Sequence, residues 1–244
     1  MNGFQPYEII APVTGAPGES IVIVADHASN HVPEGVNLGV APDVMTQHVA
    51  IDIGVAEVTR RLCEQIGCGA VLAGVSRLVI DFNREEDAPG LIPLSSDGIP
   101  IPGNHGVDAE ARLAAYYRPY HDAVAHMLAG MAQPFILSLH SFTPRLASRP
   151  DEARPWDMGI LYNRDDRAAR IAIPALQAAG LNVGDQLPYS GTLLNATMNR
   201  HAETPGRVYL GIEMRQDHVG DAQGAARMAE ILAPVVLACR NSLA

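Results

Sequence analysis

The chain contains a run of four β-branched residues, 21–24, that ends abruptly in polar side chains, in the sequence IVIVADHASNHVP. A short β-branched run favours a strand buried on both faces of a sheet. In parallel sheets, ligands bind just beyond the carboxyl ends of the strands. We therefore interpret the loop that contains Asp26, His27, Ser29, Asn30 and His31 as a candidate reaction centre. A solvated turn with surface histidines is the alternative.

Strands and helices alternate along the rest of the chain. Short apolar runs predict strands at residues 70–74, 77–82, 135–139, 158–162 and 208–214. Apolar residues at three- and four-residue steps predict helices at residues 51–66, 107–131, 165–179 and 222–243. This order predicts an α/β fold of three layers, with a largely parallel central sheet covered by helices on both faces. We expect one domain over residues 1–244, an irregular lead-in at 1–20, and a loop at 86–106 that is long enough to fold over a site.

Composition excludes several classes of protein. The chain carries 27 acidic and 17 basic residues, and its formal charge of −10 argues against a partner that is nucleic acid or an anionic membrane. All the basic residues are arginines, which excludes a lysine Schiff base. The three cysteines have no zinc-finger or CxxC spacing, and no apolar run reaches about 18 residues. We therefore expect reduced thiols, no membrane span and a cytoplasmic location.

Three predicted strands end in side chains that suit a catalytic metal site. His27 follows the first strand, His140 follows the strand at 135–139, and Glu213 lies near the end of the last strand. Two histidines and a carboxylate are typical ligands of a catalytic zinc, and a further glutamate can accept a proton from the bound water. Glu213 is placed for the role of proton acceptor; a salt bridge to Arg215 is its alternative.

Two further segments carry polar residues of interest. Asp52 lies at the start of the predicted helix at 51–66, where it either caps the helix or faces the first loop. Residues 81–84 read Asp-Phe-Asn-Arg. A guanidinium binds a carboxylate through two parallel hydrogen bonds, and an amide adds a donor beside it, so Asn83 and Arg84 suit an anionic substrate. A local salt bridge between Asp81 and Arg84 is the alternative.

Six segments carry a resemblance to a known family: DHASNHVP, HVAIDIG, SRLVIDFNRE, SLHSF, SGTLLNATMNRHAE and GIEMRQD. The segments occur in the order expected for the family, and the resemblance covers nearly the whole chain. Together they resemble the N-formylglutamate amidohydrolase family, which is related to zinc carboxypeptidases and aspartoacylases. The resemblance implies a zinc-carboxypeptidase-like or aminoacylase-like fold and a bound Zn²⁺ or another divalent metal. It also implies that His27 and His140 are metal ligands and that Glu213 is the catalytic glutamate.

The first loop departs from the pattern of the related carboxypeptidases. Their sites use His-x-x-Glu for the first two ligands, whereas the fourth position here is Asn30, and an amide is a weak zinc ligand. Asp52 lies in a segment that the resemblance also covers, so we favour it as the third ligand. Asn30 stays the alternative, either as a weaker ligand or as a hydrogen-bond donor behind the ligands.

The resemblance implies a metal-dependent amide hydrolase that acts on a small anionic N-acyl amino acid. The family's reaction releases formate and glutamate from N-formyl-L-glutamate, a step of histidine degradation. The metal would polarise the formyl carbonyl and its water, with Glu213 as general base and then as general acid. A deacylase or amidase for another N-acyl amino acid is one alternative. A non-catalytic binder of small anions that has lost its metal is another, and Asn30 is the residue that favours it.

Five residues are candidates for contact with the substrate. The segment at 81–84 resembles the aspartoacylase clamp, which implies that Asn83 and Arg84 hold one carboxylate. The second carboxylate, or the oxyanion that develops during the reaction, has three candidates: Arg77, His201 and Arg215.

Overall fold

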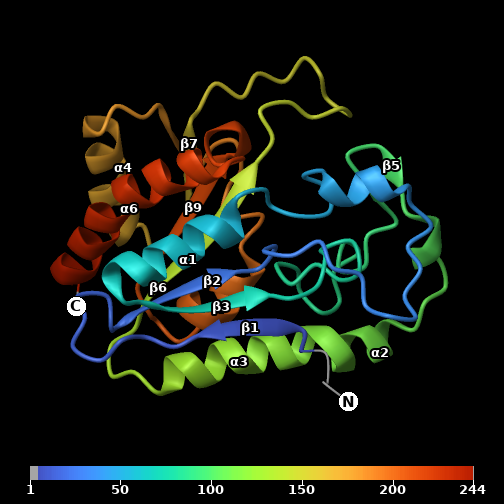
Figure 1. Cartoon of the computed structure of the whole chain (residues 1–244), viewed down its shortest axis with the longest axis horizontal. Helices are drawn as coiled ribbons and strands as arrows, with labels where there is room; N and C mark the ends of the chain where they lie inside the picture. Colours follow the sequence, from blue (N-terminus) through green and yellow to red (C-terminus); the bar gives the residue numbers. More distant parts are fainter. Residues whose placement is uncertain (1–4, 244) are drawn as a thin grey trace.

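The computed structural model describes residues 5–243, so residues 1–4 of the expected lead-in and residue 244 lie outside it. Its core is a seven-stranded sheet with the order β1-β3-β2-β6-β9-β7-β8 (Figure 1). The strands are β1 (Tyr7–Ile10), β2 (Ile21–Ala25), β3 (Gly69–Ala73), β6 (Phe135–Phe142), β7 (Met158–Leu161), β8 (Val183–Asp185) and β9 (Tyr209–Arg215). β3, β2, β6 and β9 are parallel, whereas β1 and β7 pair antiparallel with β3 and β9. The α/β class with a largely parallel, mixed sheet is confirmed.

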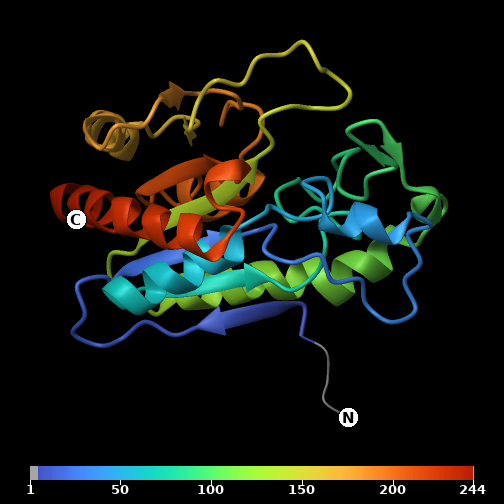
Figure 2. The same cartoon turned by 45° about the horizontal axis from the view of Figure 1, so that its top comes forward.

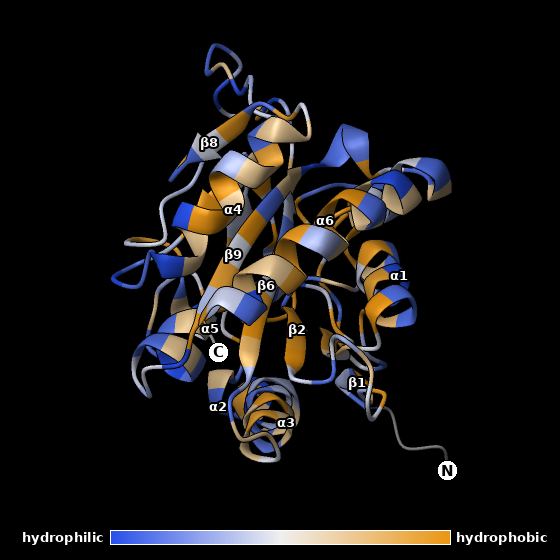
Figure 3. Ribbon diagram, turned by 90° about the vertical axis from the view of Figure 1, so that its left-hand side faces the viewer, coloured by the Kyte–Doolittle hydropathy of each residue, from blue (hydrophilic) through white to orange (hydrophobic). Residues whose placement is uncertain are grey.

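Helices cover both faces of this sheet (Figure 3). On one face, α6 (Ala222–Leu243) packs against α1 (Val55–Ile66) and α4 (Arg167–Ala178); α3 (Arg118–Ala129) covers the other. Strand β2 alternates between the two layers: Ile21 and Ile23 belong to the core beneath α1 and α6, and Val22 and Val24 belong to the core above α3. A strand buried on both faces needs an apolar side chain at every position, which explains its β-branched run.

Helix α6 is long and apolar enough to cross a membrane by length and composition alone. Half of its most apolar window is buried inside the fold, however, and it contacts α1 and α4. Met228, Leu232 and Val236 are among the buried residues of α6. A helix with one apolar face turned to the core is typical of a globular domain, and we assign α6 to that class.

The structure corrects two expectations and adds a local detail to a third. The lead-in contains a strand, β1, which pairs with β3. Residues 77–82 form turns and no strand, because the N–H groups of Val79 and Ile80 donate to the carbonyl of Ser76 instead of to a neighbouring strand. The helix at 107–131 is interrupted: α2 (Ala109–Arg112) and α3 are joined by a π-helical turn, Leu113–Tyr117.

The irregular segments after β2 and β3 gather at the end of the sheet toward which these parallel strands point (Figure 2). The loop at 86–106 contains a hairpin of β4 (Ser95–Ser96) and β5 (Ile99–Pro100). At its turn, the Asp97 carboxylate accepts hydrogen bonds from the backbone N–H groups of Ala147 and Ser148, each at 2.8 Å, and lies 3.1 Å from His48 Nε2. Asp97 therefore fastens this loop to two other segments.

We expect Asp97→Asn to destabilise the fold in a pH-dependent way. Burial alone would raise the pKa of Asp97, but the hydrogen bonds from Ser148 and Ala147 lower it to about 2. Because this folded-state pKa lies below the unfolded value of about 3.9, the stabilisation is complete above about pH 4 and is lost as the pH falls toward 2. The free energy of unfolding should fall by about 1–2 kcal/mol at pH 7.

Urea unfolding at pH 7 and pH 3 measures this effect, and Asp87→Asn removes the same charge from an exposed position of the same loop as a control. Equal losses for the two variants at pH 7, or a loss for Asp97→Asn that is no smaller at pH 3, would contradict the role given to Asp97.

Candidate functional site

Two histidines and an aspartate meet at the carboxyl ends of two adjacent strands. His27 lies two residues beyond β2, and His140 lies inside β6, which extends to Phe142 and pairs in parallel with β2. Asp52 precedes α1, and its backbone N–H donates to the carbonyl oxygen of His27 at 3.0 Å. This bond fixes the segment before α1 against the loop after β2, so the predicted Asp52 faces the first loop and does not cap the helix; Gly54 occupies the cap position.

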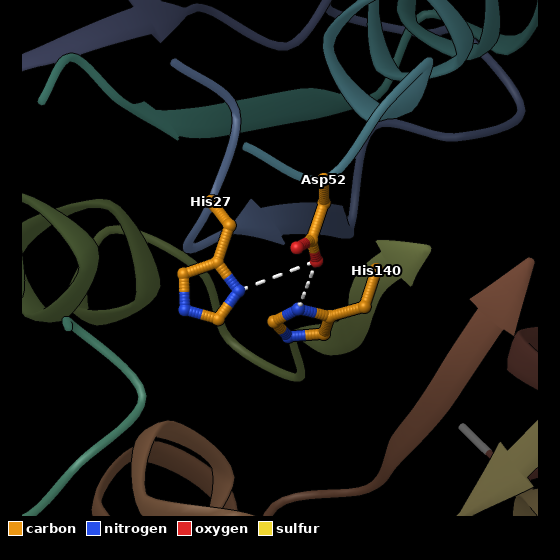
Figure 4. A group of neighbouring side chains, drawn as sticks. All are labelled: His27, Asp52 and His140. Atoms are coloured by element: carbon orange, nitrogen blue, oxygen red, sulfur yellow. Dashed lines mark hydrogen bonds and ion pairs between the residues drawn. The ribbon is translucent and has the colours of Figure 1, made fainter. Parts of the chain in front are cut away.

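Both imidazoles turn the same ring nitrogen toward one carboxylate oxygen (Figure 4). His27 Nδ1 lies 3.2 Å, and His140 Nδ1 lies 2.9 Å, from Asp52 Oδ2. The other oxygen, Oδ1, accepts a hydrogen bond from Arg77 Nη1 at 3.1 Å. The three side chains are almost fully buried, with 2%, 3% and 6% of the surface of His27, Asp52 and His140 exposed.

Two further carboxylates face the far side of the imidazoles, one for each ring. Asp81 Oδ1 lies 2.7 Å from His27 Nε2, and Asp26 Oδ2 lies 3.4 Å from His140 Nε2. Asp26 is itself fixed by the Tyr120 hydroxyl, which donates to its Oδ1 at 2.7 Å. A carboxylate on Nε2 orients the ring and leaves Nδ1 to bind a ligand, an arrangement typical of histidines that hold a metal.

The buried carboxylates stabilise positive charge on both rings. Burial alone would lower the pKa of each histidine, but Asp26 and Asp52 raise the pKa of His140 well above its usual value, and Asp81 and Asp52 raise that of His27 against an opposing effect of Arg77. Conversely, the histidines and Arg77 keep the pKa of Asp52 well below its usual range despite its burial. The same negative charge also favours a divalent cation, which would bind in place of these protons because a metal-ligating imidazole is neutral.

The residues present fit a metal. His27, Asp52 and His140 each offer one ligand atom, and these atoms lie within 4.8 Å of one another. Two imidazoles and a carboxylate form the usual protein ligand set of a catalytic zinc, with one position left for water or substrate. Asn30, the alternative third ligand, is exposed and donates its Nδ2 to the carbonyl oxygen of Met45 at 2.8 Å. The geometry therefore favours Asp52 over Asn30.

Glu213 lies beside this group on the next strand. β6 and β9 pair in parallel with His140 opposite Glu213, so the two side chains are neighbours at the sheet end. Oε2 of Glu213 is buried and has no hydrogen-bond partner, and burial raises the pKa of this carboxyl to about 7. Its alternative partner, Arg215, instead donates to Asp217 at 2.8 Å. Glu213 therefore has the geometry and the acidity of a group that takes up and releases protons near neutral pH.

One small pocket joins these residues. Its volume is about 130 Å³, and the wall around His27, Asp52 and His140 is formed by Arg77, Asn83, Arg84, Tyr189, Leu194 and Glu213. A larger cavity of about 380 Å³ lies elsewhere, around residues 128–135, and contains none of these side chains.

Asn83 and Arg84 present donors to this pocket. Oδ1 of Asn83 accepts a hydrogen bond from the backbone N–H of Thr197 at 3.1 Å, which leaves the amino group for a ligand. The Tyr117 hydroxyl donates to the carbonyl of Arg84 at 2.7 Å and fixes its backbone. The alternative salt bridge is weak, because Arg84 Nε is 3.8 Å from Asp81 Oδ2, and Asp81 is bonded mainly to His27 and Arg77.

Two predicted contacts lie outside the pocket. His201 is buried against α3, with its Nε2 3.0 Å from Nδ1 of His121 on that helix, and burial lowers its pKa to about 4. Arg215 forms ion pairs with Asp157 and Asp217. Neither side chain lines the pocket with Asn83 and Arg84.

The roles of three side chains at this site were not predicted from the sequence. Asp26 stands next to His27 in the first motif, so the sequence places it in the candidate loop. Its contact with His140 on β6 could not be predicted from the sequence. Tyr189 and Leu194 belong to a loop whose path only the fold determines, and no spacing in the sequence identifies them as pocket residues.

Comparisons with known proteins agree with this architecture. A family model described as N-formylglutamate amidohydrolase matches residues 19–220. The crystal structure of the gene product Atu2144 from Agrobacterium tumefaciens is 29% identical and superposes with a TM-score of 0.91, over 98% of this chain and 96% of that chain. The N-formylglutamate amidohydrolase from Ralstonia eutropha JMP134 is 20% identical with a TM-score of 0.79, over 98% and 99%, and shares the fold. None of the curated proteins searched matches the chain.

We expect the isosteric variant Asp52→Asn to weaken zinc binding. It removes the negative charge that both imidazoles approach, so the Kd for zinc should rise at least about tenfold. Asn30→Ala is the matched control, because it deletes the other candidate ligand, and its Kd should stay within about twofold of the wild type. Calorimetric zinc titration measures both. Weaker binding by Asn30→Ala, with Asp52→Asn unchanged, would reverse the assignment of the third ligand.

Proposed function

This chain belongs to the N-formylglutamate amidohydrolase family, and on that premise we propose that it is a metal-dependent hydrolase of small N-formyl or N-acyl amino acids. N-formyl-L-glutamate, hydrolysed to formate and glutamate, is the reaction that the family's name indicates. The observation that carries the proposal is Glu213, a buried carboxylate with a free oxygen and a pKa of about 7 beside a His-Asp-His group. A non-catalytic binder has no use for such a group.

His27, Asp52 and His140 would hold the metal. A divalent cation supplies Lewis acidity that polarises the amide carbonyl and lowers the pKa of water. The two carboxylates behind the rings, Asp26 and Asp81, keep the Nδ1 atoms of both rings directed at the cation site. These residues therefore give the site its position and its preference for positive charge.

Glu213 carries the proton through the reaction. As a carboxylate it takes a proton from the attacking water while the water oxygen bonds to the formyl carbon. As a carboxylic acid it then gives this proton to the amide nitrogen, and the C–N bond breaks to release formate and the free amine. A carboxyl with a pKa near 7 suits both directions, because its protonated and ionised forms are comparably populated near neutral pH.

Arg84 and the Asn83 amino group would hold a substrate carboxylate. Both line the pocket within the same loop, and a guanidinium and an amide together supply donors for the two carboxylate oxygens. The partner implied is a small anionic N-acyl amino acid. The cysteines of the described chain are buried, free thiols, which supports a reducing, cytoplasmic location.

Formate release from N-formyl-L-amino acids by the purified protein tests the proposal. We expect release with added zinc, loss of release after chelation, and recovery when zinc is restored. Release that persists unchanged after the metal has been removed, as verified by elemental analysis, would overturn metal dependence.

In the same assay, Glu213→Gln should lower kcat by about 10²- to 10⁴-fold because it removes the proton carrier and keeps the shape. Zinc content and substrate affinity should stay close to the wild type. Glu230→Gln, at an exposed position of α6, is the matched control and should have no effect. Turnover by Glu213→Gln at the wild-type rate would remove Glu213 from the mechanism.

A further inference from the structure

The two arginines of the pocket are not equally available to a ligand. Arg77 donates through Nη1 to Asp52 at 3.1 Å and through Nη2 to Asp81 at 2.9 Å, so two carboxylates already compensate its charge. The Arg84 guanidinium has only a distant acidic neighbour, Asp81 at 3.8 Å, and its buried Nε has no hydrogen-bond partner. Among the lining residues within the described chain, Arg84 is therefore the one guanidinium whose charge is free to bind a carboxylate.

The rest of the wall is neutral. Once the metal-binding group, Glu213, Arg77 and the Asn83–Arg84 pair have been assigned, Tyr189 and Leu194 remain to face the substrate's side chain. The Tyr189 hydroxyl accepts a hydrogen bond from Arg154 at 2.9 Å, so its own proton stays available to an acceptor. Burial and the nearby Glu213 raise the pKa of Tyr189, which keeps the phenol neutral.

Arg154 does not add a cation to this wall. Its side chain is only 1% exposed, it is ion-paired with Glu152 at 3.1 Å, and its guanidinium lies 5.0 Å from the centre of the Tyr189 ring. His201 and Arg215, the other candidates for a second carboxylate, lie outside the pocket.

We propose that this pocket selects N-formyl or N-acyl amino acids that carry one carboxylate and a neutral side chain, in preference to the dicarboxylate N-formyl-L-glutamate. The inference rests on the proposed amide hydrolysis and specifies its substrate class. Arg84 and Asn83 bind the single carboxylate, and a neutral side chain packs on Leu194 and accepts a hydrogen bond from the Tyr189 hydroxyl. A second carboxylate would lie in the same pocket of about 130 Å³ with no guanidinium left to pair with it, and a charge that loses water without gaining a partner is unfavourable.

N-formyl-L-glutamine and N-formyl-L-glutamate are the decisive pair of compounds, because they have the same shape and differ in the charge of the side chain. With the wild-type zinc enzyme, kcat/KM for the glutamine compound should exceed that for the glutamate compound by at least about tenfold. Equal values, or a preference for the glutamate compound, would overturn the inference while leaving the proposed hydrolysis intact.

A cation introduced at the neutral wall should reverse this preference. In Leu194→Arg, the ratio of kcat/KM for the glutamate compound to that for the glutamine compound should rise at least about tenfold, because the second carboxylate gains a partner. Leu193→Arg is the matched control: it adds the same charge one residue away, at a side chain that is 81% exposed and does not line the pocket. A similar rise in both variants would show a general effect of charge and contradict the role of Leu194.

Binding separates failure of the inference from failure of the proposed function. Calorimetry with the Glu213→Gln zinc protein gives the Kd of both compounds without turnover, and the glutamine compound should bind at least about tenfold more tightly. This order together with an inactive wild-type enzyme would support the selectivity and overturn the proposed hydrolysis. Tighter binding of the glutamate compound would overturn the selectivity whatever the turnover.

Discussion

The Asp52 carboxylate is shared by two imidazoles, and the whole site is arranged around this contact. His27 and His140 both direct Nδ1 at its Oδ2, while Arg77 binds its Oδ1. An ionised carboxylate with 3% of its surface exposed is unfavourable unless positive charge surrounds it, so Asp52 requires these partners as much as they require it. Asp26 and Asp81 add negative charge behind the rings: Asp81 is hydrogen-bonded to Nε2 of His27, and Asp26 Oδ2 lies 3.4 Å from Nε2 of His140. The result is an acidic cage, formed by the carboxylates of Asp26, Asp52 and Asp81 around the two histidines, in which a divalent cation would balance the negative charge.

The sheet determines which residues can reach this cage. β2, β6 and β9 are adjacent and parallel, so the side chains at their carboxyl ends meet at one edge. Helices bury both faces of the sheet and leave that edge as the place where polar groups can collect. The turn at 77–84 crosses the same edge and brings two arginines to it. Arg77 pairs with the buried carboxylates, whereas Arg84 has only a distant acidic neighbour. Among the lining residues of the described chain, Arg84 is the guanidinium left to bind a carboxylate, and the proposed choice of substrate rests on this difference between the two arginines.

Much of this arrangement was predictable from the sequence, and the failures have a common cause. Buried strands and amphipathic helices have local periodicities, so β2, β3, β9 and α6 were found close to their true bounds. His27, His140 and Glu213 follow from the same periodicity because each stands at a strand end. The apolar run at 77–82 was wrongly predicted as a strand because its burial comes from tertiary packing around a turn, which hydrophobicity alone does not distinguish from a strand. His201, Arg215, Tyr189 and Leu194 sit on loops or at positions whose contacts depend on long-range packing, and no local spacing reveals whether they face the pocket.

The proposed hydrolysis depends on a cation held by the Nδ1 atoms of both histidines. Crystals grown with one equivalent of zinc, with diffraction recorded on both sides of the zinc absorption edge, would locate the ion directly. The expected result is one strong anomalous peak within about 2.0–2.2 Å of His27 Nδ1, His140 Nδ1 and an Asp52 oxygen. A peak bound elsewhere on the chain, with these three side chains still bonded to one another as they are here, would contradict the account.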